Sequence, residues 1–316
     1  ASASSRTSPT AHSVVSRGVA GAADLPSDQT STPGAAQLLE LSALRSLLHW
    51  AYKGADGKQR GVMRALLGAE LGSLATQALP PPGVRTLLEL LASIVRGLRA
   101  ETPQSAHVSL VRDVLAPLHR PIGRLDETTP ALSVYHEPLV HCQLSLLGKQ
   151  PRLLLQLLPP LLACWPEPRE GNTAKEVLLL HELERLVELA AGNAECCGKV
   201  ALLVAPVLAR CIASENSRLS ERALQLYASE AARPCLLHSY AGGAVALVLP
   251  SLLRGGCPHW NGTVNKMSHE VLSLMQSHDP AGFAAAAEQC FGGGGGEGGE
   301  GGGGEGGGEG GGGEGA

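Results

Sequence analysis

The stretch that decides the fold is "CWPEPREGNTAKEVLLLHELERLVEL", residues 164–189, because it contains the end of one helix, a turn and the beginning of the next helix. Trp165 precedes a proline, and a residue in that position avoids the α-helical region, so the first helix is predicted to end there. Thr173 and Glu176 have the spacing of a capping box, which predicts that Thr173 caps the second helix. Beyond it, leucine and valine recur every three or four residues, while His181 and charged residues line the opposite face. The stretch therefore predicts a helical hairpin with one buried face and one solvated face.

The same apolar spacing continues through most of the chain, and turn signals separate its segments. Signals for β-strands are nearly absent, because β-branched alternation is rare and no Asn-Gly turn lies between such runs. Successive helices pair, and each pair with its turns occupies about 40 residues, which is the period of HEAT repeats. We therefore predict an all-α fold, a HEAT-like helical-repeat solenoid (an α-α superhelix), with a single globular helical bundle as the alternative. The predicted helices occupy residues 36–52, 60–78, 84–99, 106–117, 138–148, 152–163, 174–190, 197–213, 217–229, 241–254, 264–277 and 280–290.

The two ends of the chain differ in composition from this helical region. Residues 1–35 are rich in Ser, Thr, Ala and Pro without apolar periodicity, which predicts a disordered N-terminal arm; its low acid content is also a feature of transit peptides. Residues 292–316 are almost entirely Gly and Glu, so they have no apolar side chains to bury and are predicted to be a disordered tail. The solenoid is therefore expected to occupy residues 36–291.

Composition argues against several functional classes. The formal net charge is −4, so no overall positive potential draws the chain to nucleic acid. No apolar run approaches the ~20 residues that span a bilayer, so we expect no membrane partner. The eight cysteines are scattered without a Cys-x-x-Cys pair, and most lie in apolar helical stretches, as reduced core cysteines do. A cytoplasmic or nuclear location is therefore expected.

One stretch, "LSVYHEPLVHC" (132–142), comes close to the His-Glu-x-x-His motif of zinc hydrolases. Its histidines, His136 and His141, are five positions apart and therefore lie about 140° apart around a helix, too far to share a metal ion. Pro138 favours a helix that begins near it, because proline fits the first turn of a helix. His136 is therefore interpreted as part of a loop-to-helix junction.

The rest of the sequence does not indicate an enzyme. His181 and Glu182 are adjacent and are interpreted as a solvated helix face rather than a catalytic pair. There is no nucleophile motif such as Gly-x-Ser-x-Gly, and the Gly-rich tail lacks the Gly-Lys-Ser/Thr of a phosphate-binding loop. We therefore predict no catalytic residue, no cofactor and no metal. A helical hydrolase that uses the scattered histidines is the alternative.

A recognition surface is the better-supported prediction, because solenoids expose grooves lined by one helix of each pair. Residues 48–64 would line such a groove with basic and aromatic side chains, and residues 87–98 with two apolar residues one helical turn apart. Arginine beside apolar anchors suits a peptide that carries Leu or Ile together with a carboxylate or phosphate. The alternative is a solvated stripe of arginines over an ordinary core. The residues singled out are His49, Tyr52, Arg60, Arg64, Leu90 and Ile94.

Several short stretches resemble, in order and spacing, the B-prime class of protein phosphatase 2A regulatory subunits. No single motif is decisive, but seven or eight in the right order are specific. The resemblance covers about residues 48–290. The stretches are "LLELLASIVRGL" (87–98), "LAPLHR" (115–120), "LSVYHEPLVHC" (132–142), "LLACWP" (161–166), "KEVLLLHELERLVEL" (175–189), "SERALQLY" (220–227), "LPSLLR" (249–254) and "HWNGTV" (259–264).

The resemblance implies a curved stack of HEAT-like repeats and a subunit that does no chemistry itself. Its implied partners are the scaffold and catalytic subunits of the phosphatase, and its implied role is to recruit phosphoprotein substrates through a groove for Leu-x-x-Ile-x-Glu peptides. A stand-alone helical-repeat adaptor that binds peptides without a phosphatase is the alternative. The groove residues that the resemblance implies are His49, Tyr52, Arg60, Leu90 and Ile94, with Glu89 beside them.

The sequence departs from the family in this region. Trp50 stands where the family has arginine, Leu90 replaces isoleucine, and one residue is inserted between His49 and Arg60. The resemblance also implies that the first repeats of the family are missing before residue 36, which would leave an uncapped apolar end on the solenoid.

Overall fold

A computed structural model describes residues 34–292 apart from 78, 82, 99–103, 122, 238–241 and 254–257. Helices account for most of these residues, and the β-structure among them is one isolated bridge between Arg124 and Pro130. The predicted all-α solenoid is therefore confirmed. The predicted arm and tail lie outside the described residues, except for Gly34, Ala35 and Gly292, and stay predictions.

Each predicted helical stretch corresponds to a helix of the structure, with ends that differ by a few residues. The predicted 106–117 helix is the most altered, because it is divided into the short α4, a π-helical turn and a 3-10 turn. The helices are α1 (Ala35–Gly54), α2 (Gly57–Leu74), α3 (Val84–Gly97), α4 (Gln104–Ser109), the π-turn η1 (Leu110–Leu115), the 3-10 turns η2 (Pro117–His119) and η3 (Ala131–Val134), α5 (His136–Leu147), the 3-10 turn η4 (Pro151–Leu153), α6 (Leu154–Leu162), the 3-10 turn η5 (Pro168–Glu170), α7 (Thr173–Ala191), α8 (Ala194–Ile212), α9 (Ser217–Ala228), α10 (Arg233–Leu236), α11 (Gly242–Ser251), α12 (Gly262–His278) and α13 (Pro280–Gly292).

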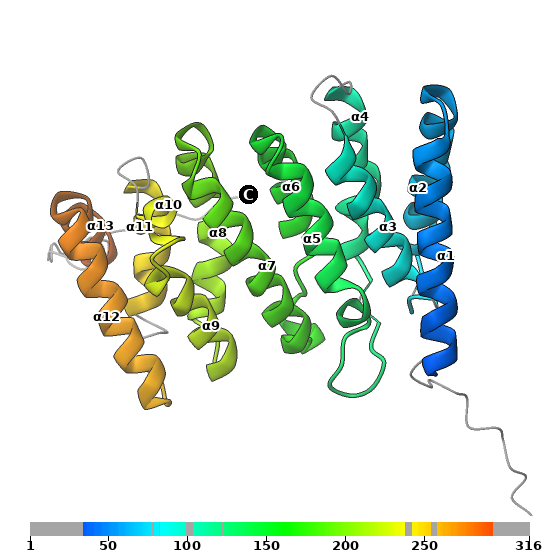
Figure 1. The fold of residues 1–316 in the computed structure, drawn as a ribbon. Helices are drawn as coiled ribbons and strands as arrows, with labels where there is room; N and C mark the ends of the chain where they lie inside the picture. The colour runs from blue at the N-terminus through cyan, green and yellow to red at the C-terminus, as the bar shows by residue number, and fades with distance from the viewer. Residues whose placement is uncertain are drawn as a thin grey trace, which may run out of the picture.

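The helices form two layers that extend side by side from α1 and α2 at one end to α12 and α13 at the other (Figure 1). Layer A contains α1, α3, α5, α7, α9 and α12, and each of these helices packs against the next one in the series. Layer B contains α2, α4 with η1, α6, α8, α11 and α13, which also pack in series. Each repeat is therefore one helical hairpin, and its two helices belong to different layers, as in a HEAT-type solenoid.

Asparagine and aspartate side chains begin many of the helices, and this corrects one detail of the prediction. The predicted capping residue of α7 was Thr173, but Asn172 is the N-cap, and its side-chain oxygen accepts a hydrogen bond from the Lys175 backbone N–H at 3.3 Å. Glu176 does not close a capping box. Its carboxylate instead accepts a hydrogen bond of 3.1 Å from the indole N–H of Trp165, which is buried below the turn.

A single apolar core runs the length of the solenoid between the two layers. Helix α3 illustrates how the sequence builds it, because Leu88, Leu91 and Val95 recur at helical spacing and are fully buried. The first hairpin has no neighbour on its outer side among the described residues, and there Trp50 is 75% exposed and Leu66 is 66% exposed.

A buried carboxylate connects three successive repeats. Glu182 of α7 is fully buried, and the Nε2 atom of His136, at the start of α5, lies 3.0 Å from its Oε2. His119, in η2, places its Nε2 atom 3.0 Å from Oε1, and its Nδ1 donates to the Ala116 carbonyl at 3.0 Å. The interpretation of Glu182 as part of a solvated face was therefore wrong, because residues distant in the sequence supply its partners.

The environment of Glu182 keeps its carboxyl group ionised. Burial alone would raise its pKa, but the charge of His119 and the hydrogen bonds from both imidazoles outweigh this and lower the pKa to about 2. Because the pKa in the folded state is below the ordinary value of 4.5, the ionised form stabilises the fold above that pH. The stabilisation is lost as the pH falls through the range from 4.5 to about 2.

We predict that Glu182→Gln lowers the free energy of unfolding by about 3 kcal/mol at neutral pH, because it removes one member of a buried, hydrogen-bonded charge group. The matched control is Glu195→Gln, since Glu195 is exposed and its 3.1 Å contact with Arg152 contributes less than about 1 kcal/mol. Denaturant unfolding followed by circular dichroism measures both. The difference between wild type and Glu182→Gln should shrink between pH 4.5 and pH 2; a difference that is absent at neutral pH would contradict this account.

Candidate functional site

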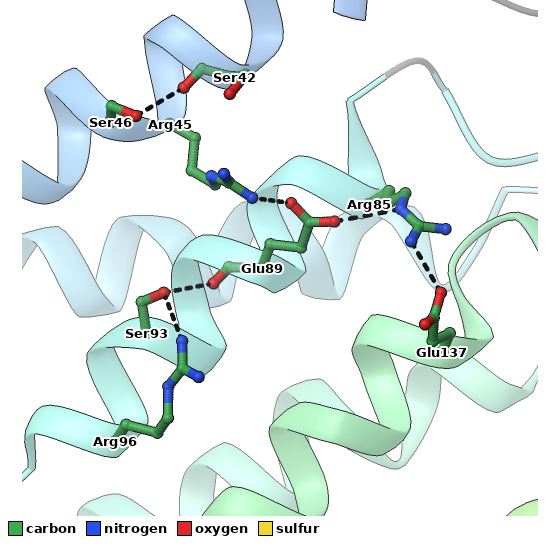
Figure 2. A network of polar contacts seen from close by, with 8 residues as sticks. All are labelled: Ser42, Arg45, Ser46, Arg85, Glu89, Ser93, Arg96 and Glu137. Carbon is green, nitrogen blue, oxygen red and sulfur yellow. Dashed lines mark hydrogen bonds and ion pairs between the residues drawn. The ribbon is translucent and has the colours of Figure 1, made fainter.

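Layer A carries a charged cleft of about 640 Å³ between α1, α3 and α5. Polar and charged side chains from all three helices line it, so its shape depends on the packing of three consecutive repeats. Figure 2 shows the polar contacts among some of these side chains, centred on Glu89. The lining residues are Arg45, Ser46, His49, Trp50, Lys53, Arg85, Glu89, Ala92, Ser93, Arg96, Glu137, Pro138 and His141.

Glu89 of α3 is at the centre of this network (Figure 2). Its carboxylate pairs with Arg45 of α1 and accepts a hydrogen bond of 3.2 Å from Arg85, one helical turn before it. Arg85 in turn donates to the Glu137 carboxylate of α5 at 2.8 Å. The hydrogen bond to Glu137, together with the one to Glu89, raises the pKa of Arg85 further above its ordinary range. The chain Arg45–Glu89–Arg85–Glu137 therefore joins α1, α3 and α5 across the cleft.

Two cations of the charged cleft are left without a carboxylate among the described residues. Lys53 lies on α1 and has no ion pair there. Arg96 of α3 donates to the Ser93 hydroxyl at 3.2 Å and lies 3.5 Å from the Nε2 atom of His141. Since Arg45 and Arg85 are matched by the two carboxylates of the lining, Lys53 and Arg96 give the charged cleft an excess of positive charge.

The structure divides the residues that were predicted to form one peptide-binding groove. His49 and Glu89 line the charged cleft. Tyr52, Arg60 and Arg64 form a separate cluster at the α1–α2 turn: the Arg64 guanidinium donates to the Tyr52 hydroxyl at 2.7 Å, and the Arg60 guanidinium lies 5.8 Å from the centre of the Tyr52 ring. Arg60 also donates to the carbonyls of Tyr52, at 3.1 Å, and of Lys53, at 2.7 Å, so it braces the end of α1.

The two apolar residues of the predicted groove lie in the core. Leu90 is 5% exposed and Ile94 is 4% exposed, on the part of α3 that packs against neighbouring helices. Ile94 lines a second groove, together with Arg64, on the side of α3 that faces layer B. The predicted groove residues therefore lie in different places: His49 and Glu89 line the charged cleft, whereas Arg64 and Ile94 line the second groove.

Sequence reasoning identified Glu89 but missed three other polar residues of α3 that line the cleft. Arg85, Glu89, Ser93 and Arg96 recur at a spacing of four, four and three residues, which places polar side chains on one face of an otherwise apolar helix. That stripe is the signal that could have identified the face of α3. Arg45 and Lys53 of α1 were also missed; they are eight residues apart, about two helical turns, and give a similar but weaker signal.

The two serine hydroxyls of the charged cleft are held by their own helices. The hydroxyls of Ser46 and Ser93 donate to backbone carbonyls of their own helices, at 2.9 Å and 3.0 Å, so neither contacts a base that would activate it. The part of the chain that the structure describes contains no group of side chains with the geometry of a metal site. The imidazoles of His119 and His136 converge on Glu182, but they contact its carboxylate directly at hydrogen-bond distances. None of the described helices is long and apolar enough to cross a membrane.

Comparison with known proteins gives consistent matches. The sequence model of the family described as "Protein phosphatase 2A regulatory B subunit (B56 family)" matches residues 40–291. The chain is 29% identical over 207 residues to the human serine/threonine-protein phosphatase 2A 56 kDa regulatory subunit delta isoform, an alignment that covers 66% of this chain and 32% of that protein. It is 31% identical over 193 residues to the Caenorhabditis elegans regulatory subunit pptr-1, which covers 61% of this chain and 33% of that protein.

A plant relative extends the match along the chain. The B-prime delta isoform of the 55 kDa regulatory subunit of Arabidopsis thaliana serine/threonine protein phosphatase 2A is 26% identical over 251 residues, which covers 79% of this chain and 48% of that protein. The chain thus spans about a third to a half of the length of the curated relatives that it matches. Because the family match covers most of the chain, including α2 to α12 and the residues that line the charged cleft, the chain belongs to the B56 family of protein phosphatase 2A regulatory B subunits.

Proposed function

We propose that the chain is a non-catalytic regulatory subunit of a serine/threonine protein phosphatase 2A, which recruits phosphoprotein substrates to the scaffold and catalytic subunits. The observation that carries this proposal is the family match over residues 40–291, which includes all of α2 to α12 and most of α1 and α13. The charged cleft supports it, because the cleft offers positive charge and no activated nucleophile. The free cysteines of the described core fit a reducing cytoplasmic or nuclear compartment.

The charged cleft is the proposed site for Leu-x-x-Ile-x-Glu peptides. Lys53 and Arg96 lack carboxylate partners among the described residues, so they are available to pair with the peptide glutamate. The exposed indole of Trp50 supplies apolar surface beside Lys53 for the leucine or isoleucine side chain. Glu89 does not contact the peptide in this proposal; it holds Arg45 and Arg85 in place at the floor of the cleft.

The proposed mechanism is tethering. A substrate held by a short motif in the charged cleft stays close to the active site of the catalytic subunit, and tethering of this kind supplies effective concentrations on the order of millimolar. Dephosphorylation then becomes selective, because proteins with the motif dwell near the active site and others do not. The regulatory chain affects the rate without taking part in the reaction.

We predict that the full chain, expressed with an affinity tag in eukaryotic cells, co-purifies with the scaffold and catalytic subunits of phosphatase 2A. Mass spectrometry of the eluate and phosphatase activity sensitive to an inhibitor of that enzyme class measure the association. A chain with the cleft substitutions described below serves as the control, since it should lose substrates but keep the two subunits. Elution of the wild-type chain alone, with peptide binding intact, would instead indicate a stand-alone adaptor.

We predict that Lys53→Ala and Arg96→Ala each weaken binding of a fluorescent Leu-x-x-Ile-x-Glu peptide about tenfold, because each removes one charge-assisted contact worth roughly 1.5 kcal/mol. Fluorescence polarisation measures the affinity. The effect should decrease with added salt, because part of the attraction is screened. Lys266→Ala, in α12, is the matched control, since Lys266 is exposed and far from the cleft.

Arg60→Ala distinguishes the charged cleft from the groove predicted from the sequence. Arg60 braces the end of α1 through two backbone carbonyls, so its loss should weaken peptide binding less than the loss of Lys53 or Arg96. If Arg60→Ala has the largest effect and the two cleft variants bind as wild type does, the peptide binds at the α1–α2 turn and the proposed site is wrong.

A further inference from the structure

A second groove, of about 480 Å³, lies between α2, α3, α4 and η1, on the side of α3 that faces layer B. We call it the layer B groove. Its floor is apolar and is formed by Leu91, Ile94, Val95 and Val114. It shares no lining residue with the charged cleft. Its volume is within the range of about 300–1,000 Å³ that is typical of small-molecule sites.

Small residues on α2 explain why the layer B groove is hollow. A Cβ atom at Gly68 would lie 3.3 Å from the Val114 side chain, and one at Gly72 would lie 3.4 Å from the Asp113 carbonyl, so α2 and η1 touch closely there. At Gly61, by contrast, an added Cβ would meet nothing within 4 Å. The two segments therefore separate toward the start of α2, and Ala65 is too small to fill the space between them.

A buried histidine without a partner points to a ligand in this groove. His107 of α4 lines the groove and is 2% exposed, yet neither of its ring nitrogens has a hydrogen-bond partner among the described residues. An imidazole carries at least one N–H donor, and burial without a partner is unfavourable, so nearly all buried polar groups in folded proteins are paired. A bound molecule with a hydrogen-bonding group would supply the missing partner after a rotation of the ring toward the groove.

The other polar groups of the layer B groove favour an anion. Arg64 lines it, and its guanidinium is held by a 2.7 Å hydrogen bond to the Tyr52 hydroxyl, which leaves further N–H donors for a ligand. The one carboxylate of the lining, Asp113, is already paired with Arg112 at 2.8 Å. The π-helical turn η1 begins three residues after His107, and π-turns within helices often occur at functional sites.

We propose that the layer B groove binds a small amphipathic anion, an aliphatic chain of about a dozen carbons that ends in a carboxylate. The aliphatic chain lies on the apolar floor, and Arg64 and His107 bind the carboxylate. This site is separate from the charged cleft and goes beyond the proposed recruiting function. Because Arg64 contacts Tyr52 at the α1–α2 turn, a ligand that binds Arg64 would also affect the contact between α1 and α2, the first hairpin of the solenoid.

The test is a calorimetric titration of the full chain with sodium dodecanoate below its micellar concentration. Wild type should bind one equivalent saturably. Ala65→Phe should abolish binding, because the phenyl ring fills the groove. Ala285→Phe is the matched control, since Ala285 is an exposed alanine on α13, at the other end of layer B. This variant should bind dodecanoate as wild type does.

Two further variants test the polar contacts. His107→Phe keeps the shape of the ring but not its nitrogens, so dodecanoate should bind at least tenfold more weakly while the thermal midpoint stays the same or rises. Arg64→Gln should weaken dodecanoate binding to a similar extent. The affinity for 1-dodecanol should agree within a factor of about three among wild type and these two variants, because the alcohol lacks the charge.

Absence of saturable binding to wild type, or equal dodecanoate affinity in wild type, Ala65→Phe and His107→Phe, overturns the proposal. Binding of the Leu-x-x-Ile-x-Glu peptide and co-purification with phosphatase subunits should persist in Ala65→Phe. A wild-type chain that binds the peptide but not dodecanoate would overturn this proposal and leave the proposed function intact. A wild-type chain that binds dodecanoate but neither the peptide nor the phosphatase subunits would do the reverse.

Discussion

Stacking between neighbouring hairpins is the constraint on which the rest of the structure depends. A hairpin of two amphipathic helices cannot bury its apolar faces alone, so each repeat is stable because the next one covers it. The core runs through both layers as one cluster, and Glu182 joins three repeats at its centre by binding His119 and His136. A buried carboxylate with two partners tolerates little displacement, because separation from either imidazole would leave its charge uncompensated. The relative placement of the repeats is therefore fixed by polar as well as apolar contacts.

This stacking positions the candidate site. The charged cleft contains no loop of its own; its side chains come from the exposed faces of α1, α3 and α5 and meet because these helices are adjacent in layer A. Helix α3 both lines the cleft and builds the core, since Glu89 and Arg96 face the cleft while Leu91 and Val95 pack in the core. Recognition by such a surface needs no chemical machinery, only a fixed spacing of charge and apolar area.

The sequence was sufficient to predict the helices, because 3.6-residue periodicity and proline positions are local signals. It was not sufficient for features that depend on residues far apart. The local sequence predicts that Glu182 belongs to a polar, solvated face. Its partners His136 and His119 lie 46 and 63 positions away, so no local pattern reveals them. Leu90 and Ile94 have the spacing of a groove and of a core alike, and only the packing of α3, a layer A helix, against its neighbours shows that both side chains are buried. Asn172 rather than Thr173 caps α7; its side-chain oxygen accepts from the Lys175 backbone N–H, and asparagine is the stronger N-cap residue of the two.

The central claim is that layer A presents a peptide-binding cleft whose cations are held in place by the stacked repeats. A crystal structure of the chain bound to a Leu-x-x-Ile-x-Glu peptide tests it most directly. The account predicts that the peptide lies between α1, α3 and α5, with its glutamate carboxylate within hydrogen-bond distance of Lys53 or Arg96. A peptide seated at the α1–α2 turn against Arg60, or on layer B, would contradict it.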